Sequence, residues 1–267
     1  MIRKPSVAGQ FYQSSPSKLS EEIGSCIVKN VKKERAIGIV SPHAGVMYSG
    51  KVAGAVFSGI EFPETFILVG PNHTGLGHPV AIMSSGTWQV PTGELKIDEK
   101  LAAALKDQNH IFSENNLAHS MEHSLELQLP FIIHFSSNVG IVPITMKTDS
   151  LDDCRAVGEA IADVIMNTPY PVNIVASSDM SHYVTDSEAR SKDKDAIEEI
   201  INLDPEGLYR TVKSRGISMC GVVPVTVMLY AANKLGAKEA GLVKYMTSGE
   251  VSGDNSYVVG YAGIIVK

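Results

Sequence analysis

Three short apolar runs, each rich in β-branched residues, end in a turn that carries a histidine. The runs span 36–40, 65–69 and 172–176, and the histidines that follow them are His43, His73 and His182. Runs of this length that are closed by Pro, Gly or Ser are typical of buried strands. Ligands of open α/β sheets bind beyond the carboxyl ends of the strands. If the three strands are parallel neighbours, the sequence predicts one site at one rim of the sheet, shared with Asp179 of the third turn.

Helical patterns alternate with strand patterns along all 267 residues. Helices are expected at 15–33, 51–57, 98–105, 120–135, 150–167, 187–203, 204–212 and 222–235, with Pro130 kinking or ending the fourth. Further strands are expected at 80–83, 140–145, 242–247 and 257–266, with a loop or hairpin at 85–95. Without a repeat or linker, this alternation predicts a single α/β domain spanning 1–267, with a largely parallel or mixed central sheet flanked by helices.

Charge and composition narrow the classes of partner. The net charge is −6 with both signs interspersed, so neither nucleic acid nor another polyanion is an expected partner. No apolar stretch approaches the length of a membrane span, and the N-terminus lacks the apolar core of a signal peptide. The three cysteines are odd in number and widely spaced, which fits a reduced, cytoplasmic location.

His43 and His73 are the first candidates for a functional site. A single histidine at a strand end is usually structural, but two in matching positions on adjacent strands favour a metal site, because imidazole is the commonest side-chain ligand. The prolines at 42 and 71 stiffen the turns that carry them. Asp179 and His182, three residues apart, suit general acid–base work in which the carboxylate orients the imidazole. The alternative is an aspartate that caps the following turn.

Cys220 precedes a predicted helix, and a helix N-terminus favours the thiolate. It is therefore a candidate metal ligand or nucleophile, or else a small buried residue, which is how we interpret Cys26 and Cys154. The sequence HSMEH at 119–123 matches the H-x-x-E-H pattern of zinc peptidases. The helix is expected to begin only near His119, so the two histidines need not share a face. GPNHTG at 70–75 lacks the spacing of a phosphate loop, which excludes that interpretation.

Several of these segments together resemble the Memo family, whose prokaryotic members are called AmmeMemoRadiSam system protein B. They are SPHAG at 41–45, GPNH at 70–73, EHSLE at 122–126 with LP at 129–130, SSDMSH at 177–182, CG at 220–221, AGQFY at 8–12 and SYVVGYAG at 256–263. The match covers nearly the whole chain, and its motifs come in the family's order.

The resemblance implies a fold like that of the class III extradiol dioxygenases, which hold non-haem Fe(II) with two His and one Glu. His43 and His73 match the two metal histidines, and His182 matches the acid/base. Cys220 stands at the position of the carboxylate, and Memo proteins are reported to bind copper or iron through two His and a Cys. Thiolate in place of carboxylate puts ring cleavage in doubt and favours Cu(I), zinc or redox-active iron. His119 is not part of the family pattern.

Three hypotheses follow. The first is a metal-dependent oxidoreductase that binds one iron or copper ion, with zinc as a third candidate, through His43, His73 and Cys220. Its catalytic residues are His182, Asp179 and His123, and Tyr48, Glu122 and Glu126 line or support the pocket. The second is a metal-free hydrolase with Cys220 as nucleophile and His182 with Asp179 as base and orienter.

The third hypothesis is a non-catalytic binding or adaptor protein with a vestigial dioxygenase pocket. The resemblance implies it, because animal Memo proteins are described as adaptors that recognise phosphorylated receptor peptides. A small molecule or a peptide is then the expected ligand. The name of the prokaryotic members implies a radical-SAM protein as a partner.

Overall fold

The computed structural model describes residues 1–267 and contains one main sheet of nine strands and a small sheet of three. The strands are β1 (Ile2–Arg3), β2 (Gly38–Ser41), β3 (Thr65–Pro71), β4 (Val80–Ile82), β5 (Thr87–Val90), β6 (Gly93–Lys96), β7 (Ser113–Glu114), β8 (Gly140–Met146), β9 (Val172–Ser177), β10 (His182–Val184), β11 (Ala240–Thr247) and β12 (Val258–Val266). The helices are α1 (Pro16–Cys26), α2 (Val46–Ser58), α3 (Glu99–Gln108), α4 (Leu117–Ser120), η1 (Glu126–Gln128), α5 (Leu129–Phe135), α6 (Leu151–Met166), α7 (Asp186–Ile201), α8 (Pro205–Ser214), α9 (Val222–Lys234) and α10 (Gly249–Ser252).

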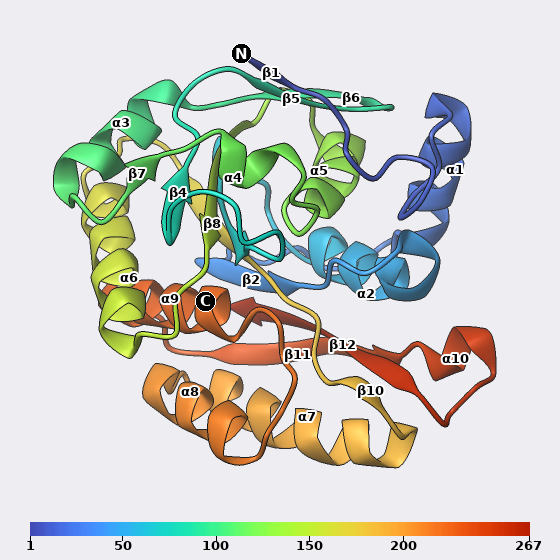
Figure 1. Cartoon of the computed structure of the whole chain (residues 1–267). Coiled ribbons are helices and arrows are strands. Elements are labelled where there is room, and N and C mark those ends of the chain that lie inside the picture. The colour runs from blue at the N-terminus through green and yellow to red at the C-terminus, as the bar shows by residue number, and fades with distance from the viewer.

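The main sheet is mixed, with the order β10-β12-β2-β9-β3-β8-β4-β7 and β11 paired to β12. β2, β9, β3 and β8 are parallel to one another, and β12 runs antiparallel to β2. The central strands β2, β3 and β9 are buried along their whole length, which explains their continuous apolar character. Helices α1, α2 and α5 cover one face, and α6 to α9 cover the other (Figure 1). The prediction of one α/β domain with a mixed, helix-flanked sheet is confirmed.

The strands that carry the site are not arranged as expected in one respect. β9 lies between β2 and β3 and pairs in parallel with both, so β2 and β3 are not neighbours. All three strands still end at the same edge, because Ser41 pairs with Ser177 and Val69 with Ala176. β9, which follows β2 and β3 in the sequence, thus lies between them at the centre of the site.

Two predicted helices have different boundaries. The first ends at Cys26 and not at 32–33, because the amide of Val28 donates to Ser58 Oγ of α2 at 3.0 Å and so leaves the helical pattern. The predicted helix at 120–135 is interrupted over 121–125, and Pro130 lies in the first turn of α5. Proline suits that position, because amides of the first helical turn have no partner within the helix.

The helix expected at 51–57 also begins earlier, at Val46. The remaining predicted helices and strands agree with the structure within a few residues, and the hairpin at 85–95 is β5–β6. Asp98 and Ser150 cap α3 and α6 by accepting from the amides of Leu101 and Asp153. None of the helices combines the length and the apolar character needed to span a membrane.

Candidate metal centre

The carboxyl ends of the three central strands bring the predicted residues together. His43, His73 and Asp179 each lie two residues beyond the end of their strand, β2, β3 and β9 respectively. The rings of His43 and His73 are 5.2 Å apart between centroids, and the Asp179 carboxylate accepts from the amide of His43 at 2.8 Å. One rim of the sheet therefore carries two imidazoles and a buried carboxylate.

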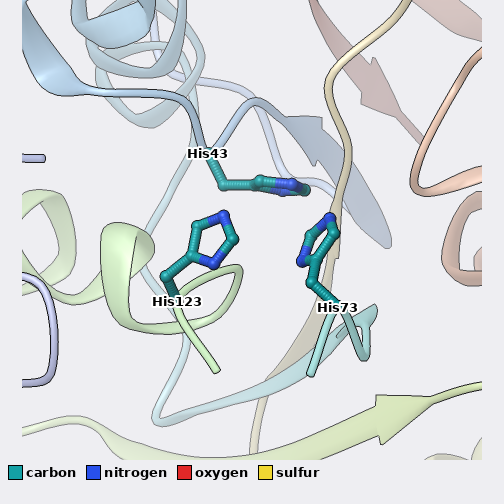
Figure 2. Close-up of side chains that lie close together, drawn as sticks. All are labelled: His43, His73 and His123. Atoms are coloured by element: carbon teal, nitrogen blue, oxygen red, sulfur yellow. The ribbon is translucent and has the colours of Figure 1, made fainter. Parts of the chain in front are cut away.

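A third imidazole, that of His123, joins them from the non-helical segment before η1. Its ring lies 4.6 Å from that of His73 and 5.6 Å from that of His43, and Figure 2 shows the three side chains grouped around one point. One ring nitrogen from each histidine lies within 4.8 Å of the other two. His43 is 2% exposed, whereas the side chain of His73 is 34% exposed, so the group opens to solvent on the His73 side.

Glu122 orients two of these rings. Its Oε1 lies 3.0 Å from His73 Nδ1 and 3.4 Å from His123 Nδ1. Oε1 also accepts from the amide of Ser124, and Oε2 accepts from the amide of His73. Burial alone raises the pKa of this carboxyl, but hydrogen bonds and the neighbouring histidines lower it to about 2. A carboxylate that holds Nδ1 leaves Nε2 of each ring as the free ligand atom, which is the usual arrangement around a metal site.

The orientation of His43 follows from a chain of hydrogen bonds. Ser177 Oγ donates to the carbonyl of Ser124 at 2.7 Å and accepts from Gln128 Nε2 at 2.9 Å. Its only proton is thus used, so His43 Nδ1, at 2.9 Å from the same oxygen, is the donor. Burial and the nearby His123 and His73 lower the pKa of His43 well below its ordinary value. The ring is therefore neutral, with a lone pair on Nε2.

Cys220 provides a sulfur beside this lone pair. Its Sγ lies 3.3 Å from His43 Nε2 and accepts from the amide of Asp179 at 3.3 Å. Gly221 allows this approach, because a Cβ there would lie 2.4 Å from the carbonyl oxygen of Ser177. Burial, and then the charge of Asp179, raise the pKa of the thiol. This direction opposes the thiolate that the sequence analysis expected at the helix N-terminus.

His182 is not held by Asp179, contrary to the sequence-based expectation. Its amide donates to Ser218 Oγ at 2.7 Å, and its Nδ1 donates to the carbonyl of Ser218 at 2.8 Å. Asp179 instead accepts from the backbone of His43 and Ala44, and burial raises its pKa to about 6. The reason is geometric: the turn after β9 aims Asp179 at the turn after β2. His182 still keeps a free Nε2.

Three other residues lie away from the histidine cluster. Glu126, expected in the pocket, is turned toward the N-terminal segment and bonds to Arg3. Tyr48 packs beside Tyr261 in a small apolar cluster. His119 is fully buried with its ring 5.7 Å from Trp88, so the H-x-x-E-H pattern does not form a zinc-peptidase site. Sequence reasoning missed the positioning roles of Ser177, Gln128 and Ser218, although Ser177 lies in one of the motifs noted above.

Comparison with known proteins gives one family. The family described as Memo-like protein matches residues 3–265. A MEMO1 family protein of Methanosarcina barkeri is 41% identical over 268 residues, covering 100% of both chains. A MEMO1 family protein of Methanopyrus kandleri is 40% identical, covering 100% of this chain and 99% of the relative.

Among solved structures, the fold is similar to that of an uncharacterized protein from Escherichia coli K12, with a TM-score of 0.57 and 13% sequence identity. The alignment covers 86% of this chain and 100% of the other. At this identity the likeness concerns the fold alone. The family match over residues 3–265 and the relatives of about 40% identity over the full chain show that this chain belongs to the Memo-like family.

Proposed function

We propose that this protein binds one metal ion through His43, His73 and Cys220, with His123 as a further nitrogen donor, and acts as a metal-dependent oxidoreductase. The observation that carries the proposal is the orientation of the donors. Nδ1 of His43 is hydrogen-bonded to Ser177 and Nδ1 of His73 to Glu122, and Nδ1 of His123 lies 3.4 Å from Glu122. A thiol lies 3.3 Å from the free nitrogen of His43. Two ligands of one tetrahedral ion lie about 3.5 Å apart when the metal–nitrogen and metal–sulfur bonds are about 2.0 and 2.3 Å.

The donor set limits the metal. Imidazole and thiolate together favour copper, iron or zinc over magnesium or calcium, which prefer oxygen. A bound copper or iron ion would supply electron transfer, which no side chain of the cluster supplies. His182 Nε2 would move protons at the edge of the site, because Ser218 fixes the ring through its Nδ1.

Metal content and proton release test this proposal together. Protein purified without nickel resin or chelator should contain about one equivalent of iron, copper or zinc, and alanine at His43 or His73 should abolish it. Replacing the exposed His134 by alanine should leave it unchanged.

Adding metal to the metal-free protein should release about one proton at neutral pH, since the neutral Cys220 thiol must ionise to become a ligand. Calorimetry in buffers of different ionisation enthalpy measures this number. Cys220→Ser should bind more weakly and release none, whereas Cys154→Ser should behave as the wild type. Full metal content in the variants at His43, His73 and Cys220 would contradict the proposal.

The contact between Cys220 and His43 also fits the alternative of a metal-free hydrolase, with His43 in place of His182 as the base. The raised pKa of the Cys220 thiol disfavours this alternative, because the thiolate is the nucleophilic form. Labelling by iodoacetamide separates the two. Rapid modification of Cys220 near neutral pH, unaffected by chelator or added metal, supports the hydrolase, and protection by metal supports the oxidoreductase.

A further inference from the structure

A cavity of about 540 Å³ opens beside the proposed metal ligands His73 and Cys220. It runs along the ends of β3 and β8 to the first turn of α9. Its apolar lining comes from Pro71, Met146, Val222, Val223 and Pro224. The volume lies within the range of about 300–1,000 Å³ that small-molecule sites occupy.

Two of the polar side chains in the lining are already bonded within the protein. Asn72 donates to the carbonyl of Leu76 at 2.7 Å, and its side-chain oxygen accepts from the hydroxyl of Thr74. Thr148 donates to Asp153 at 2.6 Å. These groups support the wall and leave little capacity for a ligand.

Lys147 differs from these two residues, because it is the only cationic residue in the lining and its ammonium forms neither an ion pair nor a hydrogen bond within the protein. The chain enters Lys147 directly from β8, and its amide donates to the carbonyl of Pro79 at 2.7 Å. Its Nζ lies over Gly75, 2.8 Å from the place that a Cβ there would take. The exposed ammonium therefore lies close to the turn after β3, on a residue that lines the cavity.

We infer that this cavity binds a small organic carboxylate, with the anion on Lys147 and the apolar body against the turn of α9. A single ammonium balances one negative charge, whereas phosphate sites usually gather arginines or several donors. The negative charge of Asp149, another residue of the lining, further disfavours a dianion. The inference rests on the proposed function only in placing the reactive end of the ligand at His73 and Cys220.

Ligand-observed NMR tests it with phenylacetate, phenylacetamide and phenyl phosphate as probes, on metal-free and on metal-loaded protein. Phenylacetate should bind to both forms at least about fivefold more tightly than the other two, as one charge-assisted hydrogen bond predicts. Lys147→Met should remove this preference, and Lys147→Arg should restore most of it. Lys18→Met, on the exposed side of α1, should bind as the wild type does.

Two results would overturn the inference. One is equal binding of the acid and the amide by the wild type. The other is loss of phenylacetate binding on removal of the metal while Lys147→Met still binds it, because the carboxylate would then bind to the ion and not to Lys147. Neither result affects the metal content or the proton release that test the proposed function, so the two proposals fail separately.

Discussion

Glu122 and Glu126 lie four residues apart in the segment that precedes α5, and both are completely buried. They face opposite ways. Glu122 bonds to His73 and lies beside His123, whereas Glu126 is turned toward the N-terminus of the chain. Burial alone therefore does not identify a functional carboxylate, and the nature of the partners does.

The partners of Glu126 are permanent and structural. Its carboxylate accepts from Arg3, from the amides of Ser6 and Val7, and from the hydroxyl of Tyr12. The guanidinium of Arg3 also lies 4.5 Å from the centre of the Trp88 ring and donates to two carbonyls. The carboxylate of Glu126 and the guanidinium of Arg3 therefore find their hydrogen-bond partners inside the protein, and neither side chain is available to a ligand.

The partners of Glu122 are two imidazoles that keep a free nitrogen and reach solvent, since the side chain of His123 is 21% exposed. The two carboxylates share an ionised state, because nearby donors and charges oppose the effect of burial and lower both pKa values. The difference is that the histidines beside Glu122 keep a ring nitrogen for a ligand, whereas the partners of Glu126 are bonded within the protein.

Removing Glu126 should have the largest effect on stability. Glu126→Ala leaves the buried cation of Arg3 unpaired, which should lower the free energy of unfolding by about 3–5 kcal/mol. Denaturant unfolding of the metal-free protein measures this loss. The matched control is Glu206→Ala, which breaks exposed pairs with Arg155 and Arg210 and should cost less than about 1 kcal/mol. A loss as small as that of the control would contradict the structural role of Glu126.

Glu122→Gln should instead act mainly on the metal. The change weakens the bond to His73 and removes the charge beside His123, and such outer partners typically contribute tenfold to 100-fold, or about 1–3 kcal/mol, to metal affinity. Competition with a chromophoric chelator measures the affinity, with Glu126→Gln as the comparison under conditions where both variants are folded. Equal losses in the two variants would show that the two carboxylates do not divide their roles as described.

Phe11→Ala should give the smallest effect, because Phe11 contributes a single ring contact between the N-terminal segment and the site. Its ring lies 4.8 Å from that of His123, and such a pair contributes about 0.5–1.5 kcal/mol. We expect metal affinity to fall less than tenfold. Phe135→Ala removes a similar contact with His134, at 5.2 Å and outside the site, and should leave the affinity unchanged. A drop in affinity for Phe135→Ala would mean that general destabilisation, and not the contact, is being measured.

Local patterns predicted most of the fold. The β-branched runs predicted β2, β3 and β9, and the caps Asp98 and Ser150 predicted the starts of α3 and α6. The errors lie where a tertiary bond competes with the local pattern. The first helix ends early because Val28 bonds to α2, and 121–125 is not helical where Glu122 accepts from the amides of His73 and Ser124.

The sequence by itself determined which residues stand at strand ends, because hydrophobic period and turn residues are local properties of the chain. Only the tertiary structure decided that β9 lies between β2 and β3, that Ser218 and not Asp179 holds His182, and that Glu122 and Glu126 face opposite ways. Strand order and the direction of a buried side chain depend on which distant donors come within about 3 Å, and that distance is set by packing of the whole chain.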